Sequence, residues 1–174
     1  MSDVPMLETE RLILRGHTLA DFDDLAALWS DEAVVRHIGG RPSTPEECWS
    51  RLHRYRGHWA LMGHGFWAIE DKASGRYAGD LGLADFRRGL DHPFASSPEA
   101  GWALAPWSHG RGYASEALAA ALAWGEGHFG SPRVWCIIDP DNAPSIRVAE
   151  KAGFRRHGEA AYRGDPTVVF VRGA

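Results

Sequence analysis

The segment PWSHGRGYASEALAAAL (106–122) holds the clearest candidate for binding chemistry in this chain. Gly110 and Gly112 flank Arg111, and a run of alanines and leucines follows at once. Glycine frees the backbone from Cβ sterics, and the first turn of a helix presents unpaired N–H groups at the positive end of its dipole. The pattern indicates a phosphate-bearing ligand held on the backbone of 110–115. The structural alternative is a glycine turn that packs a small-residue helix tightly.

Two common phosphate motifs are excluded at this segment. It lacks the Gly-Lys-Ser/Thr ending of a P-loop, and it lacks the third glycine and the later acidic residue of a dinucleotide fingerprint. A second candidate segment is DPDNAPSIRVAEKAGF (139–154), where Asp141 or Asn142 is expected to cap a helix with Pro144 in its first turn. Asn142 also offers a donor and an acceptor at the end of a strand, so this segment is a candidate binding element as well.

The elements that position these segments follow from hydrophobic periodicity and from helix-end signals. Thr44, Pro45 and Glu47 form a capping box with proline at the first helical position. The predicted helices cover 18–29, 44–62, 113–128 and a short piece of SIRVAEKAGF that stops at Gly153. The predicted strands cover 11–15, 65–71, 76–86, 99–106 and 133–138, followed by a hairpin of EAAYR and TVVFV around the turn GDP. This mixture predicts one α/β (α+β) domain over residues 1–174.

Composition and charge exclude several classes of protein. The 174 residues carry a net charge of −4, which gives no sign of the basic footprint of a nucleic-acid-binding protein. We expect neither a membrane span nor a signal peptide, because the chain has no run of 18 apolar residues and no apolar leader; the cytoplasm is the expected location. No metal is expected, because Cys48 and Cys136 fit no ligand spacing and His53, His58 and His64 do not share a helix face.

Together these segments resemble the GNAT superfamily of N-acetyltransferases. GWALAPWSHGRGYASEAL is similar to the family's strand, pyrophosphate loop and helix, and NAPSIRVAEKAGF is similar to its N-x-x-S-x-x-x-x-x-K-x-G-F segment. LETERLILRGHTLADFDDL resembles the opening of the branch that contains the ribosomal-protein N-terminal acetyltransferases. The resemblance extends over about 7–155.

The resemblance implies acetyl-CoA as the co-substrate. It also implies a mixed, mostly antiparallel sheet with helices on both faces, split between a fourth strand at 100–104 and a fifth at 133–138. The pantetheine arm would pair with the edge of the fourth strand, and the backbone of 110–115 would take the pyrophosphate. The cofactor-binding residues that it implies are Ala103, Leu104, Ala105, His109, Gly110, Arg111, Gly112, Tyr113, Ala114, Ser115, Asn142 and Lys151.

The chain departs from the family pattern at two positions. Trp107 stands three residues before the first glycine of the loop, where the family usually has Gln or Arg. Ala149 stands seven residues after Asn142, where many members carry the tyrosine that protonates the departing thiolate. Ser145, as in the resembling branch, or water would then supply that proton.

Direct acetyl transfer needs a neutral amine, so a base or an ordered water must remove a proton. Glu99, just before the fourth strand, is the expected base; Asp80 and Asp85 are alternatives, and a solvated surface carboxylate is the plain alternative for Glu99. Backbone N–H groups near 103–105 are expected to stabilise the oxyanion. Neither cysteine has a recognisable nucleophile setting, so no covalent enzyme intermediate is expected.

The predicted activity is acetyl transfer to a primary amine of a small molecule or a protein N-terminus. At pH 7.4 neutralising a lysine (pKa about 10.4) costs about 4 kcal/mol, whereas an α-amine (pKa about 7.7–8.0) costs less than about 1 kcal/mol. An isolated Glu99 would be a weak base, so an α-amine is the preferred acceptor. A non-catalytic acyl-CoA-binding or sensor module, supported by Ala149, is the alternative, and transfer of a longer acyl group is a weaker one. Both a monomer and a homodimer remain open.

Overall fold

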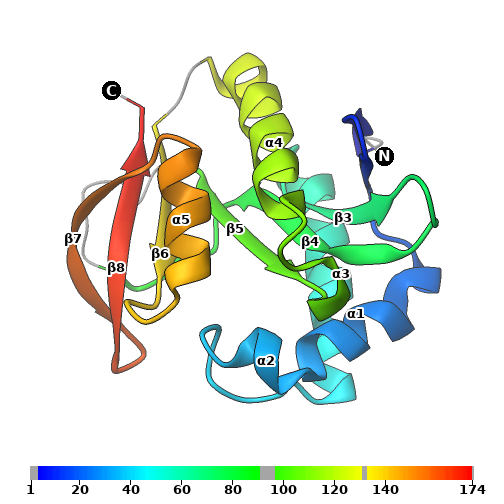
Figure 1. The fold of residues 1–174 in the computed structure, drawn as a ribbon, viewed down its shortest axis with the longest axis horizontal. Helices are drawn as coiled ribbons and strands as arrows, with labels where there is room; N and C mark the ends of the chain where they lie inside the picture. Colours follow the sequence, from blue (N-terminus) through cyan, green and yellow to red (C-terminus); the bar gives the residue numbers. More distant parts are fainter. Residues whose placement is uncertain (1–3, 91–96, 131–132, 174) are drawn as a thin grey trace.

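An eight-stranded sheet runs through the computed structural model, which describes residues 4–90, 97–130 and 133–173 (Figure 1). The strand order is β1-β2-β3-β4-β5-β6-β8-β7. Neighbouring strands among these residues are antiparallel, apart from the parallel pair β5 and β6. The strands are β1 (Leu7–Glu8), β2 (Leu12–Arg15), β3 (Phe66–Asp71), β4 (Tyr77–Ala84), β5 (Glu99–Leu104), β6 (Val134–Ile138), β7 (Arg155–Tyr162) and β8 (Asp165–Arg172).

Helices cover both faces of the sheet, which confirms the predicted fold class. Figure 1 shows α4 and α5 in front of the sheet and α3 behind it. Side chains alternate along β3, so Trp67 packs with Leu118 of α4, whereas Ala68 packs with Leu25 of α1 and Leu52 of α3. The helices are α1 (Phe22–Ser30), α2 (Glu32–Val35), α3 (Pro45–Met62), α4 (Tyr113–Phe129) and α5 (Ala143–Lys151), with short 3-10 turns at Leu19–Asp21 and Pro106–Ser108.

The predicted ends of α3 are confirmed in detail. The Thr44 hydroxyl accepts the Glu47 N–H at 3.2 Å, and the Glu47 carboxylate accepts the Thr44 N–H at 2.8 Å, which completes the capping box. Gly63 then adopts a left-handed φ of 71° and ends the helix. None of the helices formed by the described residues combines the length and apolarity needed to cross a bilayer.

Three local features differ from the prediction. Strand β1 and helix α2 span two and four residues, which is too short for a periodic pattern to show. The hairpin turn is not GDP: Arg163 and Gly164 form it, with φ of 56° and 92°. A two-residue turn with positive φ at both positions matches the twist of the flanking strands, so β7 and β8 pair further than expected.

Gly79 brings β4 and β5 unusually close to each other. Its φ is 144°, and a Cβ at this position would lie 2.2 Å from the carbonyl oxygen of Ala103. No side chain fits there without moving one of the two strands. The spacing between β4 and β5 is therefore fixed beside the stretch of β5 that carries the candidate site.

Candidate functional site

The sheet opens between β5 and β6. The two strands pair at one register position, Glu99 with Trp135, and the Trp135 N–H donates to the Pro98 carbonyl at 3.1 Å. Strand β4, in contrast, pairs with β5 at six positions. Beyond Glu99 the strands diverge (Figure 1), so the rest of β5 has one unpaired edge. The predicted split of the sheet is confirmed.

Alternate amides of β5 face opposite sides of the strand. The Ala105 N–H donates to the Ala78 carbonyl at 2.8 Å and therefore faces β4. Strand alternation then turns the Ala103 amide the same way and directs the Leu104 amide to the open edge. Among the residues near 103–105, Leu104 is thus the candidate donor to an oxyanion. A His109 ring nitrogen lies 2.8 Å from the Leu104 carbonyl, so this ring folds back on the end of β5.

The glycine loop after β5 presents its backbone to solvent. Gly110 and Gly112 are left-handed, with φ of 72° and 78°. A Cβ at Gly110 would meet nothing within 4 Å, and no described side chain caps α4, so amides of its first turn can meet an anion. Arg11 holds the loop by donating to the Arg111 carbonyl at 2.8 Å and by pairing with Glu116 at 2.6 Å. These features fit a pyrophosphate.

Trp107 supports the loop through stacking. The Arg76 guanidinium lies 4.1 Å and that of Arg111 5.6 Å from the centre of its ring. At the start of α4, the buried Tyr113 donates its hydroxyl to Asp71 at 2.6 Å. Hydrogen bonds from Ser74 and Tyr113 lower the pKa of the Asp71 carboxyl. A tryptophan–arginine stack therefore stands at the position where the resemblance leads one to expect Gln or Arg.

A hollow of about 340 Å³ separates α4 from α5 and brings together two predicted cofactor residues. Ser115 comes from the first turn of α4, and Lys151 comes from the last turn of α5. An ion pair of Arg172 with Glu126 at 2.8 Å lies beside it. The hollow places a cationic side chain near the glycine loop, where a further phosphate or a nucleotide could lie.

The second predicted segment forms the start of α5. The Asn142 side chain accepts the Ser145 N–H at 3.2 Å, as expected of a cap. The Ser145 hydroxyl accepts the indole N–H of Trp102 at 3.3 Å, so Ser145 lies against β5. Ala149 is completely buried, on the side of α5 that faces the core. The space that a tyrosine ring would need is therefore filled by core side chains.

Glu99 is neither isolated nor solvated, and that expectation was wrong. Its side chain is 3% exposed, and both carboxylate oxygens lie 2.8 Å from Nε of Arg88. Burial raises the pKa of the Glu99 carboxyl, and the Arg88 guanidinium opposes that rise. Because side chains alternate along β5, Glu99 lies on the face opposite Trp102 and its partner Ser145. The two candidate proton-transfer groups therefore approach the strand from opposite faces.

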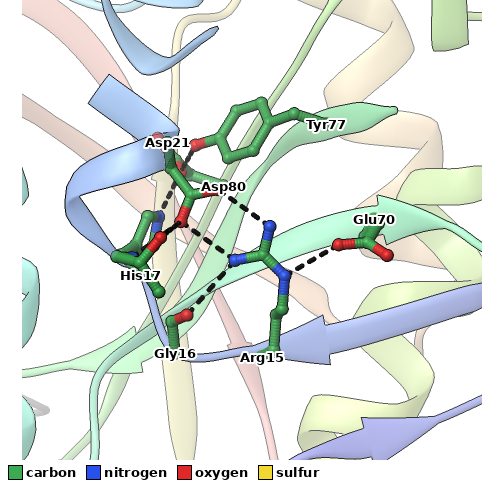
Figure 2. A network of polar contacts seen from close by, with 8 residues as sticks. Arg15, Gly16, His17, Asp21, Glu70, Tyr77 and Asp80 are labelled. Atoms are coloured by element: carbon green, nitrogen blue, oxygen red, sulfur yellow. Dashed lines mark hydrogen bonds and ion pairs between the residues drawn. The ribbon is translucent and has the colours of Figure 1, made fainter. Parts of the chain in front are cut away.

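The two alternative carboxylates have other contacts. Asp80 is fully buried and accepts hydrogen bonds from His17 at 2.6 Å and from the Tyr77 hydroxyl (Figure 2). It also accepts the indole N–H of Trp29 at 2.7 Å. Burial and the neighbouring Asp80 raise the pKa of Tyr77. Asp85 pairs with the exposed Arg87 at 3.0 Å. Asp80 thus ties α1 and the start of the chain to β4, whereas Glu99 is the carboxylate at the split.

One side-chain bridge spans two segments far apart in sequence. His37 follows α2, and a nitrogen of its ring lies 2.8 Å from the Asp139 carboxylate, just after β6. The Asp141 amide and His37 lower the pKa of Asp139 against the effect of burial. The two residues are 102 positions apart, so no local pattern could have revealed the contact.

Comparison with known proteins agrees with this geometry. A model of the acetyltransferase (GNAT) domain matches residues 11–155, so the chain belongs to the GNAT acetyltransferase family. An uncharacterized N-acetyltransferase, YoaA of Bacillus subtilis, is 27% identical over 158 residues, which cover 88% of this chain and 85% of the relative. Membership confirms the predicted class of enzyme, an acetyl-CoA-dependent acetyltransferase.

Solved structures show the same fold. A protein assigned to the GnaT acetyltransferase family of Bordetella pertussis superposes with a TM-score of 0.85 at 36% identity, covering 97% of this chain and 99% of that one. RimL, a ribosomal L7/L12 alpha-N-protein acetyltransferase solved in complex with coenzyme A, has a TM-score of 0.79 at 18% identity, covering 97% of this chain and 98% of its own. The described residues contain no group of three or more His, Cys, Asp or Glu placed to hold a metal.

Proposed function

We propose that this protein transfers the acetyl group of acetyl-CoA to an α-amine, either of a peptide N-terminus or of a small molecule, within one domain of residues 1–174. The observation that carries the proposal is the unpaired edge of β5. At one end of this strand lies the open glycine loop, and at the other end lies the buried carboxylate of Glu99. A thioester held along the edge would lie between an anion site and a base.

Three parts of the chain would hold acetyl-CoA, which supplies an activated thioester when bound. Backbone amides of 110–115 would bind the pyrophosphate, with Arg11 and Glu116 fixing the loop. The open edge of β5 would pair with the pantetheine amides. Ser115 and Lys151 would meet the nucleotide end in the hollow between α4 and α5.

The remaining residues would handle protons and charge. Glu99 lies five residues along β5 from Leu104, about 16 Å at 3.3 Å per residue. It would therefore accept, through ordered water, the proton that the amine loses as its nitrogen bonds to the thioester carbon. The Leu104 N–H would donate to the thioester oxygen. As the carbon–sulfur bond breaks, Ser145 would pass a proton to the sulfur, directly or through water, from the other face of β5. The free thiol has a pKa of only about 8.5, so this last assistance is modest.

An α-amine suits the surroundings of Glu99 better than a lysine does. Arg88 lies against the carboxylate, so a lysine ammonium, which is almost fully charged at pH 7.4, would meet a guanidinium at the base. An α-amine reaches its neutral form near pH 7.4 at little cost. The raised pKa of Glu99 makes it a stronger base than an exposed carboxylate. A stronger base reduces the expected rate advantage of the α-amine over lysine, but the α-amine should still react faster.

Release of free CoA measures this proposal directly. Two peptides of matched length are compared, one with a free N-terminus and no lysine, the other with a blocked N-terminus and one lysine. We expect the free N-terminus to react faster. A clear preference for the lysine peptide would overturn the choice of acceptor. Acetyl-CoA binding without CoA release on any amine would favour the non-catalytic alternative.

A further inference from the structure

Helix α3 presents two arginines, one turn apart, towards the face of the sheet on which Glu99 lies. The Arg51 guanidinium stacks on Trp29 at 3.5 Å. The Arg54 guanidinium lies 5.8 Å from the centre of the Phe86 ring, on the segment that follows β4. Partial burial lowers the pKa of Arg54, and repulsion from Arg51 and from Arg88 adds to this effect. The Arg54 guanidinium therefore lies close enough to those of Arg51 and Arg88 to be repelled by them.

Among the described residues, Arg88 is the one of these three cations that pairs with a carboxylate. Glu99 is bound by Arg88 through both of its oxygens. Within the part of the chain that the structure describes, Arg51 and Arg54 form no ion pair, and Nε of Arg51 is buried without a hydrogen-bond partner. The buried Nε of Arg51 is a donor without an acceptor, which is unfavourable, whereas Arg54 is exposed; the planar fork of each guanidinium matches a carboxylate. The arrangement leaves donors in place for an anion.

The position of these arginines points to the acceptor and not to the CoA phosphates. Trp29 beneath Arg51 bonds to Asp80, whose register partner on β5 is Ala103. Arg88 bonds to Glu99 at the start of β5. The arginines thus flank β5 on the α3 face, whereas the glycine loop leads into α4, which packs on the other face.

We propose that Arg51 and Arg54 bind a carboxylate that the acceptor carries close to its α-amine. This inference rests on the proposed function, since it names the class of acceptor for the same site. The carboxylate has two possible sources: the main chain of a free amino acid, or an acidic side chain near the N-terminus of a peptide. Bidentate guanidinium pairing would orient the amine towards Glu99 and the edge of β5.

The test compares acceptors in two matched pairs. One pair is a short free-N-terminus peptide with Glu at positions 2 and 3 and the same peptide with Gln there; the other is an amino acid and its amide. We expect the carboxylate member of one pair to have a kcat/KM about tenfold to a hundredfold higher, the range for a hydrogen bond to a charged group. A preference in the peptide pair assigns a side-chain carboxylate, and one in the amino-acid pair assigns the main-chain carboxylate.

Arg54→Gln should abolish that preference by raising the KM of the carboxylate acceptor, with kcat and the KM for acetyl-CoA nearly unchanged. Arg56→Gln is the matched control, because Arg56 is an exposed arginine of the same helix that borders a different hollow, beside Val4 and Gly16. Equal kcat/KM within both pairs for the wild-type protein, or a preference that survives Arg54→Gln, would overturn this inference while leaving acetyl transfer to α-amines intact. Absence of CoA release with all four α-amines would instead refute the proposed function. The comparison of the matched acceptors with the wild-type protein tests the inference even if a variant does not fold.

Discussion

The two ends of β5 are built in opposite ways. At its C-terminal end, the glycine loop is one contiguous segment, open to solvent, that offers backbone amides. At its N-terminal end, Glu99 is buried against Arg88, near Arg54 of a helix more than thirty residues earlier in the chain. In the proposed function the first end binds phosphate chiefly through backbone amides, so it would suit any ligand with the same phosphates. The acceptor proposed for the second end would depend on a few side chains, so it could change without any change at the first end.

The largest effect is expected at Glu99, because the acceptor end relies on a single carboxylate. Glu99→Gln keeps the size of the side chain and an acceptor for Arg88, but it removes the base. We expect kcat to fall about a hundredfold or more, within the range for general-base catalysis, with an unchanged KM for acetyl-CoA. Glu159→Gln, at an exposed position of β7, should keep the wild-type rate. An undiminished rate in Glu99→Gln would assign the proton to water.

The cofactor end should be most sensitive to backbone conformation. Gly112→Val puts a β-branched residue at a φ of 78°, with its Cβ 3.5 Å from the guanidinium of Arg11, which holds the loop. We expect acetyl-CoA to bind about tenfold to a hundredfold more weakly, measured by calorimetry. Gly130→Val is matched to it, since Gly130 has a φ of 73° at the other end of α4; it should lose stability but keep its affinity. Equal affinity in the folded Gly112→Val variant would remove the loop from the cofactor site.

Arg88→Gln tests how the positive charge of Arg88 affects the pKa of Glu99. Arg88 opposes the rise that burial causes in the pKa of Glu99, so its removal raises that pKa further. A base must be ionised, so activity is lost as the pH falls through its pKa; in the variant this loss begins at a higher pH. The measurement is kcat/KM against pH with one peptide. Arg87→Gln, at the neighbouring exposed arginine, should leave the profile in place, and an unmoved profile in Arg88→Gln would mean that another group titrates.

The same pKa shift affects folding stability. A carboxyl whose pKa is raised in the folded state contributes stability below its unfolded pKa, and this contribution is lost as the pH rises through the folded pKa. Arg88→Gln should therefore lose stability more steeply than the wild type as the pH rises above the normal range for a glutamate. Urea midpoints measured across that range test the sign independently of activity.

The smallest effect is expected at Ser145. Ser145→Ala removes the hydroxyl that accepts the Trp102 N–H, and with it the proposed proton for the thiolate. Because a thiolate leaves readily near neutral pH, kcat should fall only about twofold to tenfold, with acetyl-CoA affinity unchanged. If Ser145→Ala kept its full kcat, solvent and not Ser145 would supply the proton to the thiolate.

Much of the fold was predictable because its signals are local. The capping box at Thr44, the stop at Gly63 and the start of α4 after Gly112 each depend on a few adjacent residues. The two-residue strand β1 and the four-residue helix α2 carry too little periodicity to be seen. The turn at Arg163 was missed because a non-glycine residue adopts a positive φ there.

The candidate site also has parts that the sequence could predict and parts that it could not. The glycine loop could be predicted because all of its parts lie within six residues of one another. The Arg88–Glu99 pair and the bridge of His37 to Asp139 join segments that only the folded chain brings together. A buried carboxylate next to an arginine cannot be distinguished from a solvated one by sequence position alone.

The one-sided pairing of β5 has a consequence for isotope exchange. Hydrogen-bonded amides exchange with deuterated water only when the structure opens, whereas amides at a free edge exchange far sooner. The Ala105 amide, bonded to Ala78, should retain its hydrogen long after the adjacent Leu104 amide has lost its own. A ligand laid along the edge of the strand would slow exchange at Leu104 and leave Ala105 as it was. Exchange at the Leu104 amide would thus report whether a ligand occupies the split, and the Ala105 amide would serve as the reference.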